Sequence, residues 1–242
     1  MQGFADLSAH SPDGTPVKMM DLVPAEGHLV IVTGCLTCPK FLQSYRDVEA
    51  IAHDYRSTEH PVAFVYLYKA LAHPENGGWI QSYTLEERLH QVKAAAEELK
   101  TKVPFVCDGM DNSVSHALGG SPNSFLVLKG DGTVVAASRW AENRALRASL
   151  AEAVGPSPTT STPEDIGVPP FKRPSRAASS EVPRVNVSGT MHALKTSPAK
   201  SELPHYVKLR SEVEPGVLQG SEGKMYLGFH IDPVHETHWN NL

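Results

Sequence analysis

Two runs of apolar residues, HLVIVT at 28–33 and PVAFVYLY at 61–68, constrain the fold of this chain more than any other feature. Each run is short, continuous and rich in β-branched or aromatic residues, which is typical of a strand buried on both faces. Between them, apolar residues recur every three or four positions, as on the inner face of a helix: Phe41, Tyr45, Val48, Ala52 and Tyr55. Strand, helix and strand in this order predict a parallel β-α-β unit.

The same alternation continues to about residue 155. Thr84 predicts a helix start with Glu87 as its capping-box partner, and Gly130-Asp131-Gly132 is a strong hairpin signal between two strands. Further strands and helices are expected at 17–22, 84–99, 103–107, 124–129, 133–138 and 141–154. Helices between parallel strands, followed by a hairpin and a last helix, predict an α/β fold, a three-layer α/β/α sandwich, over residues 1–155.

The remaining chain differs in composition. Eight of the 19 prolines lie in residues 156–200, where Phe171 is the only aromatic residue, so that this stretch predicts a disordered Pro/Ser-rich linker. Residues 201–242 regain alternating apolar residues, and strands at 206–213 and 224–231 could pair as a hairpin. This small β-rich tail is too short to fold without support, so we expect it to pack on the main domain or on a partner.

Composition also limits the class of protein. A net charge of -5 provides no basic field for nucleic acid. The N-terminal residues lack the basic flank and apolar core of a signal peptide, and no apolar run approaches the roughly 20 residues that span a bilayer. A cytoplasmic protein is therefore expected, in which three cysteines indicate redox or metal chemistry and not a disulfide scaffold.

The stretch GCLTCPKF, residues 34–41, carries the chemistry that the sequence predicts. Proline favours the first turn of a helix, so Pro39 predicts that a helix begins there with Cys38 as its N-cap. The free N–H groups and the helix dipole at that end favour a thiolate, which makes Cys38 the expected nucleophile. Cys35 could resolve an oxidised Cys38 by forming a disulfide. Half of a zinc site, or two inert cysteines, are the alternatives, and Cys107 is interpreted as a core residue.

A proline loop before the hairpin adds to this pattern. Pro122, in Gly120-Ser121-Pro122-Asn123, precedes the strand SFLVL at the place where a thioredoxin-type fold has a cis-proline facing its cysteines. The cysteine pair together with this proline resembles the thioredoxin fold. In the familiar arrangement the proline lies between the cysteines and the first cysteine attacks, whereas here Pro39 follows the second, and the expected nucleophile moves with it.

A more specific resemblance, to iodothyronine deiodinases, extends from about Val17 to Trp140. GCLTCPKF is similar to their active-site stretch, in which a selenocysteine between Thr and Pro stands where Cys38 does. YLYKALAHPENGGW resembles their strand-end motif and its insert, which places His73 and Trp79. PFVCDGMDN is similar to their strand running into Asp, Met and Asn, and GGSPNSFLVL falls where they carry Ala-Leu-Pro-Glu-Arg. The resemblance implies a thioredoxin-like domain with a deiodinase-type insert.

Several residues depart from that family. Sulfur replaces selenium, Leu36 replaces a cysteine, and a membrane anchor like that of the animal enzymes is not expected. Acidic residues before the Ala-His pair become Lys69, Ala70 and Leu71, and the Glu-Arg after the proline becomes Asn123-Ser124. Because those polar groups serve hormone handling in the family, the departures argue against thyroid hormone as the natural substrate.

The resemblance gives roles to three further residues. His73 is interpreted as a proton donor to the leaving group or as a partner of the thiolate, and otherwise as a solvent-facing loop histidine. Thr37 could hydrogen-bond the sulfur or a helix N–H. Trp79 either walls a substrate pocket or caps the insert against the core. Thr37, Trp79 and Pro122 are thus the expected substrate-binding residues.

The tail sequence HIDPVHETHW offers a separate candidate, a zinc or iron site. Its ligands would come from His230, Asp232, His235 and His238. Since Asp232-Pro233 is typical of a turn and no helix-borne spacing is present, a polar strand end is the favoured interpretation, and no metal is predicted.

Together these patterns predict a thiol-dependent oxidoreductase resembling deiodinases, in which Cys38 attacks a disulfide sulfur, a peroxide oxygen or an aryl-bound halogen. Cys35 or an external thiol such as thioredoxin or glutathione restores the reduced form, so no bound cofactor is expected. A binding module without turnover and a Cu or Zn chaperone or sensor are the alternatives. Neither nucleic acid nor membrane is an expected partner, and a homodimer stays open.

Overall fold

The computed structural model describes residues 3–56, 62–74, 76–172, 185 and 187–235, which form two compact units. The first unit comprises Met1–His73 and Thr84–Arg173, and the second comprises Pro74–Tyr83 and Pro174–Leu242. The first unit therefore includes residues 156–172, which composition assigned to a linker. Among the described residues, no helix is both long enough and apolar enough to cross a membrane.

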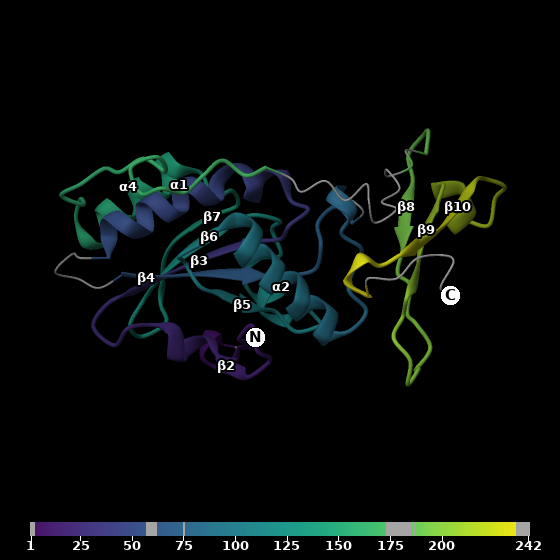
Figure 1. Ribbon diagram of the computed structural model, residues 1–242, viewed down its shortest axis with the longest axis horizontal. Helices are drawn as coiled ribbons and strands as arrows, with labels where there is room; N and C mark the ends of the chain where they lie inside the picture. The colour runs from purple at the N-terminus through teal and green to yellow at the C-terminus, as the bar shows by residue number, and fades with distance from the viewer. Residues whose placement is uncertain (1–2, 57–61, 75, 173–184, 186, 236–242) are drawn as a thin grey trace. The chain divides into compact units, whose positions relative to one another are not determined.

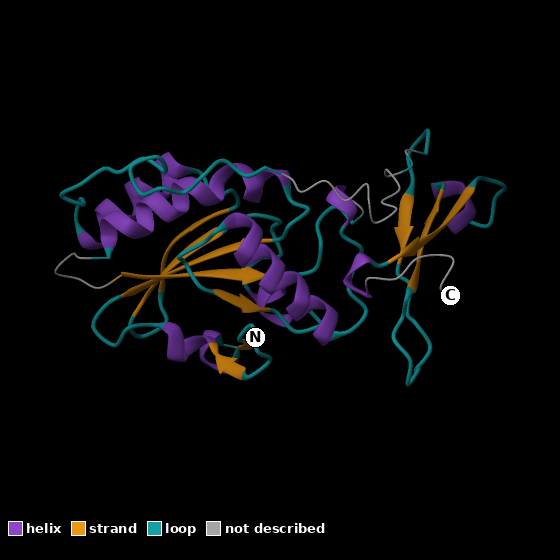
Figure 2. Ribbon diagram, in the orientation of Figure 1, coloured by secondary structure: helices purple, strands orange, loops and turns teal. Residues whose placement is uncertain are grey.

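A seven-stranded mixed sheet forms the centre of the first unit (Figures 1 and 2). Its strand order is β2-β1-β5-β4-β3-β6-β7. The strands are β1 (Ser8–His10), β2 (Pro16–Lys18), β3 (His28–Gly34), β4 (Val62–Tyr68), β5 (Phe105–Cys107), β6 (Phe125–Lys129) and β7 (Val134–Ser138). β3, β4 and β5 are parallel, and β6 returns antiparallel beside β3. The predicted β-α-β-α-β order and the terminal hairpin are confirmed.

Three helices cover one face of this sheet: α1 (Pro39–Tyr55), α2 (Leu85–Leu99) and α4 (Asn143–Val154). α1 and α4 lie side by side (Figure 1). Tyr66 and Tyr68 lie two positions apart on β4, so their side chains point to the same face of the sheet. The Tyr66 hydroxyl donates to Glu49 of α1 at 3.1 Å, and the Tyr68 hydroxyl donates to Gln91 of α2 at 3.4 Å. Both crossover helices are therefore anchored on this face through buried tyrosines.

The opposite face packs against α3 (Ser113–Ala117) and the N-terminal turns η1 (Phe4–Asp6) and η2 (Met19–Leu22). Its apolar core joins strand residues such as Ile31 and Leu67 to Val114 of α3 and to Met19 of η2. Helices on both faces of one sheet give the thioredoxin-like three-layer α/β/α sandwich that the sequence predicted.

Some local elements differ from the prediction. The leading strand expected at 17–22 is shorter, because β2 ends at Lys18 and the chain turns into η2. β1 was not predicted, since three residues are too few to show a pattern. Pro61, the predicted start of the second buried strand, lies outside the described residues. The capping box is confirmed: the Glu87 N–H donates to the Thr84 side chain at 3.2 Å, and the Thr84 N–H donates to the Glu87 carboxylate at 3.3 Å.

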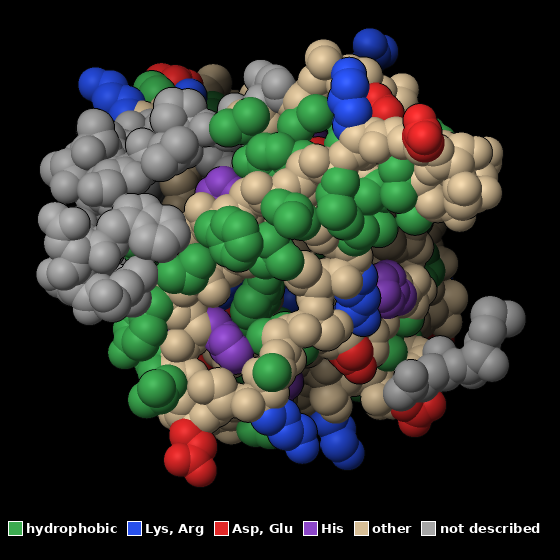
Figure 3. Space-filling view, turned by 90° about the vertical axis from the view of Figure 1, so that its right-hand side faces the viewer, with side chains coloured by type: hydrophobic (Ala, Val, Ile, Leu, Met, Phe, Trp, Pro, Cys, Tyr) green, Lys and Arg blue, Asp and Glu red, His purple; other side chains and the backbone are tan. Residues whose placement is uncertain are grey.

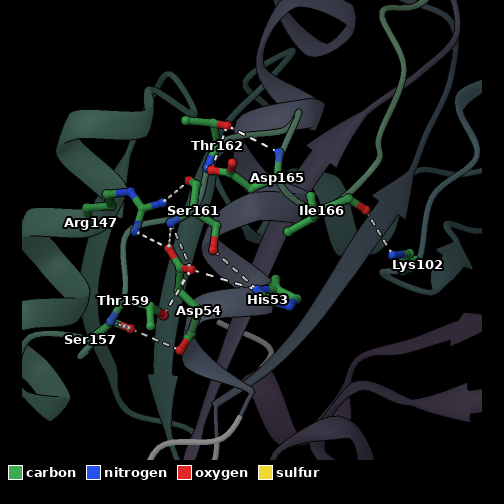
Figure 4. Close-up of polar contacts among 10 residues, drawn as sticks. All are labelled: His53, Asp54, Lys102, Arg147, Ser157, Thr159, Ser161, Thr162, Asp165 and Ile166. Atoms are coloured by element: carbon green, nitrogen blue, oxygen red, sulfur yellow. Dashed lines mark hydrogen bonds and ion pairs between the residues drawn. The ribbon is translucent and has the colours of Figure 1, made fainter.

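Residues 156–172 are attached to α1 and α4 by polar contacts (Figure 4). Asp54, buried near the end of α1, accepts two hydrogen bonds of 3.0 Å from the Ser161 N–H and pairs with Arg147 of α4 at 2.7 Å. Arg46 donates to the Val168 carbonyl at 3.0 Å. Burial raises the pKa of Asp54, but the hydrogen bonds from Ser161 and Arg147 lower it more, so that this pKa lies below its usual value.

A three-stranded antiparallel sheet with strand order β10-β9-β8 forms the second unit. Its strands are β8 (His192–Leu194), β9 (Val207–Val213) and β10 (Met225–Ile231), with the short helix α5 (Pro215–Leu218) between the last two. The predicted hairpin of β9 and β10 is confirmed, whereas β8 falls within the predicted linker. Tyr83 of the 74–83 segment joins this unit, because its hydroxyl donates to the Leu209 carbonyl at 3.2 Å.

Candidate functional site

The two cysteines of GCLTCPKF lie at the two ends of one tight turn. Cys35 directly follows β3, and Cys38 is the N-cap of α1 with Pro39 in the first helical turn, as predicted. The Cys38 N–H donates to the Cys35 carbonyl at 3.1 Å, which closes a β-turn. Since a β-turn holds its end Cα atoms within about 7 Å, the two sulfurs start from positions compatible with a disulfide. Both thiols are free in this structure.

Close packing behind the turn fixes its position. A Cβ atom at Gly34 would lie 2.2 Å from the ring of Phe41 in α1, so only glycine allows β3 and α1 to approach this closely. Phe41 is fully buried and meets the ring of Tyr66 edge-on, with ring centroids 5.3 Å apart. The aromatic core beneath the site therefore determines where the helix N-terminus lies.

Cys38 differs from the sequence expectation in its electrostatics. Its side chain is only 2% exposed, and burial raises the pKa of the Cys38 thiol above its usual value. Backbone N–H groups of Phe41 and Lys40 at the helix start lower this pKa, as predicted, but by less than burial raises it. Burial therefore opposes the thiolate that the helix start was expected to favour at Cys38, because desolvation outweighs the helix N-terminus, and the assignment of Cys38 as nucleophile stays a prediction.

Cys35 is also fully buried, and its sulfur has two polar neighbours. The Ala72 N–H donates to Cys35 Sγ at 3.2 Å, and the Thr37 hydroxyl lies 3.4 Å from the same sulfur. Thr37 in turn accepts a hydrogen bond of 3.1 Å from the His73 N–H. The predicted contact of Thr37 with a sulfur is found, but the sulfur is that of Cys35. The loop after β4 thus encloses the first cysteine with polar groups.

The side chain of His73 takes no part in the hydrogen bonds described above, and Trp79 belongs to the other unit. The His73 side chain is exposed, and within the described residues only its backbone N–H bonds to the site. Trp79 is buried and belongs to the second unit. The roles expected for both side chains stay predictions.

The proline loop lies beside the cysteine turn but has a different backbone from that expected. Among the described residues, no peptide bond is cis, so the Ser121–Pro122 bond is trans and the expected cis-proline is wrong. The Ser121 carbonyl accepts hydrogen bonds from the Thr33 hydroxyl at 3.3 Å and from Lys69 Nζ at 3.0 Å. Asn123 Nδ2 donates to the Thr33 carbonyl at 3.0 Å. These bonds fix the trans loop against the end of β3.

Lys69 is the residue of this site that sequence reasoning missed. Its side chain is 9% exposed, and Nζ donates to the carbonyls of Gly120 and Ser121 at 3.3 and 3.0 Å. Its charge lowers the pKa of Cys38, against the larger effect of burial. In the sequence Lys69 stood out only as a departure from the acidic residues of the resembling family, which was the available signal.

The segment after β5 supports the site from below. Asn112, with a positive φ of 55°, accepts hydrogen bonds from the Ala70 N–H at 3.2 Å and from Arg88 Nη1 at 3.0 Å. Asp108, fully buried, accepts from the N–H groups of Val114 and Ser115 at 3.1 and 2.7 Å. The DGMDN sequence therefore organises the loop that carries Ala72.

Cys107 is a core residue, as interpreted from the sequence. It is fully buried at the end of β5, and burial raises the pKa of its thiol to about 12. Such a thiol stays protonated at neutral pH and takes no part in the site.

The candidate metal ligands of the tail belong to the second unit. Asp232 forms a buried ion pair with Lys208 and accepts from the Val234 N–H at 3.1 Å, all within the second unit. His238 lies outside the described residues. Among the described residues, no third His, Cys, Asp or Glu gathers with Cys35 and Cys38 into a metal-binding group. The arrangement in the first unit is thus that of a dithiol in a turn, with a nearby ammonium.

Comparison with known proteins places this dithiol in a family. A sequence model of the family described as iodothyronine deiodinase matches residues 6–139, more than half of the chain, including both cysteines. No curated protein sequence gives a significant match.

Solved structures give weaker likenesses. A secreted Mycobacterium tuberculosis disulfide oxidoreductase is 12% identical, with 62% of this chain and 97% of that chain covered and a TM-score of 0.46. An exposed lipoprotein thioredoxin of Streptococcus pneumoniae is 17% identical, with 60% and 98% covered and a TM-score of 0.44. An uncharacterized Geobacillus kaustophilus protein is 23% identical, with 55% and 64% covered and a TM-score of 0.43. Because these TM-scores are low, the assignment rests on the family match and on the strand order.

Proposed function

This chain belongs to the iodothyronine deiodinase family, and from that premise we propose that it is a thiol-dependent oxidoreductase with Cys38 as nucleophile and Cys35 as resolving thiol. The family and the thioredoxin-like fold both support a redox role. The substrate we propose is a disulfide, a peroxide or an aryl halide, each of which offers an electrophilic atom that Cys38 attacks while the group bonded to that atom leaves with the bonding electron pair.

With a disulfide substrate, the proposed cycle balances in two steps. The Cys38 thiolate forms a bond to one substrate sulfur, and the other sulfur leaves as a thiolate and takes up a proton. Cys35 then loses its proton, attacks Cys38 Sγ and releases the second substrate thiol. The two cysteines are oxidised to a disulfide by two electrons, and an external dithiol or two molecules of a small thiol reduce them again.

The hydrogen bond between the Cys38 N–H and the Cys35 carbonyl carries this proposal, because it holds the two cysteines at the ends of one turn. The Ala72 N–H, which donates to Cys35 Sγ, and the Thr37 hydroxyl, which lies 3.4 Å from it and can donate, suit a sulfur that becomes an anion when the disulfide is reduced. Since both sulfurs are buried, the cycle also requires that the turn open to admit the substrate.

A panel of hydroperoxides, small disulfides and iodophenols tests the proposal on the full chain. We expect Cys38→Ser to abolish turnover of every accepted substrate. Cys35→Ser should leave one equivalent of substrate converted per chain and then stop, unless an external thiol is supplied. Cys107→Ser is the matched control and should keep full turnover. Turnover that survives in Cys38→Ser would overturn the proposal.

The wild type and the Cys35→Ser variant also distinguish the two alternatives, a binding module and a metal chaperone. A chain that converts no substrate but binds Cu(I) or Zn(II) one to one, with binding lost in Cys35→Ser, would be a metal carrier. A chain that does neither would be a binding module.

A further inference from the structure

The buried lysine beside the cysteine turn has no part in the cycle described above. Lys69 follows β4 directly, as Cys35 follows β3, and in these parallel strands Gly34 lies opposite Tyr68. The Lys69 N–H donates to the Gly34 carbonyl at 3.3 Å, so the pairing continues one residue past both strands. Because paired strands lie about 4.8 Å apart, Lys69 and Cys35 leave the sheet from neighbouring positions.

The Lys69 ammonium is held by neutral groups alone. Its two hydrogen bonds go to backbone carbonyls, those of Gly120 and Ser121, and no carboxylate among the described residues forms an ion pair with it. A buried ammonium without a carboxylate partner is costly. Its positive charge can therefore interact favourably with the sulfurs of Cys35 and Cys38.

Several ionisable groups near Lys69 change its pKa or interact with its charge. Burial lowers the pKa of Lys69, while Cys35, Asp108 and Cys38 raise it. Asp108, at the end of β5, already accepts hydrogen bonds from Val114 and Ser115 and is near the Arg88 charge.

Tyr68, the residue before Lys69, remains a neutral phenol, because burial raises its pKa well above the usual value. The loop that contains Gly120 and Ser121 faces the ammonium with carbonyl groups. The thiols of Cys35 and Cys38 are therefore the remaining groups that interact with the Lys69 charge.

We propose that Lys69 is a positioning residue of this site, whose ammonium, fixed by the Gly120 and Ser121 carbonyls, stabilises the thiolate forms of Cys38 and Cys35. The inference rests on the proposed function, since it explains how a buried sulfur reaches the anionic form that attacks. Lys69 forms no covalent bond in the cycle. The proton of each thiol leaves to solvent or to the departing substrate thiolate, and the ammonium keeps its own.

Replacing Lys69 tests this assignment through the reactivity of Cys38, which can be measured without substrate. The rate of Cys38 alkylation by iodoacetamide is followed from about pH 7 to about pH 10 in the full chain, with mass spectrometry of the labelled peptide. We expect Lys69→Met to slow alkylation about tenfold at each pH below the midpoint, which corresponds to a midpoint higher by about one pH unit. Lys69→Arg should keep the wild-type profile, because guanidinium retains the charge.

Lys93→Met is the matched control, because it removes one positive charge from an exposed position on α2. Its profile should equal that of the wild type. A folded Lys69→Met protein with the wild-type profile would overturn the inference, as would a raised midpoint in Lys69→Arg.

Folding is checked by circular dichroism. If Lys69→Met does not fold, Lys69→Gln replaces it, since the amide can still donate to the loop carbonyls. If neither folds, Lys69→Arg decides: the wild-type profile supports a charge requirement, and an upward shift contradicts it.

The two proposals fail in different ways. A wild-type Cys38 that reacts with iodoacetamide and depends on Lys69, in a chain that turns over no substrate, would contradict the proposed function alone. Turnover that depends on Cys38 with an alkylation profile independent of Lys69 would contradict only the present inference.

Discussion

The two sheets of this protein distribute polar and apolar residues in opposite ways. In the first unit, both faces of the sheet are covered, and residues such as Ile31 and Tyr66 are fully buried. In the second unit, the buried residues include Lys208 and Asp232, which are 2% and 0% exposed, while Met225, Leu227 and Phe229 of β10 are 56%, 51% and 62% exposed. Hydrophobic side chains gather on the face of the molecule shown in Figure 3.

This difference shows that the two units have different sources of stability. Burial of apolar side chains on both faces stabilises the first unit, and the dithiol turn is placed by that core. The second unit relies on its strand ladder, on the Lys208–Asp232 ion pair and on Tyr83, whose ring lies 5.0 Å below Lys208 Nζ. Substitutions in the two units should therefore have effects of different size.

The largest effect is expected for Phe41→Ala in the first unit. The variant removes a fully buried ring that contacts Tyr66 and leaves a cavity, which should lower the free energy of unfolding by about 4 kcal/mol. Urea unfolding followed by circular dichroism measures this loss. A decrease below about 1 kcal/mol would show that the aromatic core does not determine the stability of this unit.

A somewhat smaller effect is expected for Lys208→Met in the second unit. The change leaves Asp232 buried without its partner, which should lower the local stability of β9 and β10 by about 3 kcal/mol. Hydrogen exchange of the β9 amides measures the free energy of opening. Lys224→Met, at an exposed position, is the control. Unchanged protection of the β9 amides in Lys208→Met would show that the ion pair does not stabilise the second unit.

A smaller and pH-dependent effect is expected for Asp54→Asn. The wild-type carboxylate has a pKa below its usual value, so its contribution is present above the unfolded pKa of about 3.9 and is lost as the pH falls through the folded pKa. At neutral pH the variant should lose about 2 kcal/mol, because charged hydrogen bonds to Ser161 and Arg147 disappear. Unfolding free energies of the two proteins should therefore converge as the pH falls through the lowered pKa of Asp54. A difference independent of pH would contradict the assignment.

The smallest effect is expected for Phe229→Ala, the counterpart of Phe41→Ala. Because the side chain is largely exposed, the free energy of unfolding should change by less than about 0.5 kcal/mol in the same urea experiment. A loss above about 2 kcal/mol would indicate that the exposed face of β10 is covered in solution.

Local sequence signals predicted the elements that depend on neighbouring residues. Pro39 gave the start of α1, Thr84 and Glu87 gave the start of α2, and Gly130-Asp131-Gly132 gave the turn between β6 and β7. Each of these depends on groups a few residues apart, such as the Thr84 side chain and the Glu87 N–H. The alternation of strands and helices could therefore be predicted from the sequence.

The candidate site was predicted only in part. The N-cap position of Cys38 followed from Pro39, but its raised pKa depends on burial by residues distant in sequence. The trans Pro122 loop and the buried Lys69 depend on a contact between residues 69 and 121. The attachment of residues 156–172 depends likewise on Asp54, about 100 positions earlier. Such contacts leave no local pattern, because the same residues would also suit a solvated surface.

Sequence by itself determined the order of strands and helices, the N-cap position of Cys38 and the family to which the chain belongs. Tertiary structure alone decided the burial that raises the pKa of Cys38, the polar contacts of Cys35 Sγ and the position of the Lys69 charge. The physical reason is that hydrogen bonds within a turn or helix end are set by adjacent residues. Desolvation and electrostatic interactions depend on every group that the fold brings near, whatever its position in the chain.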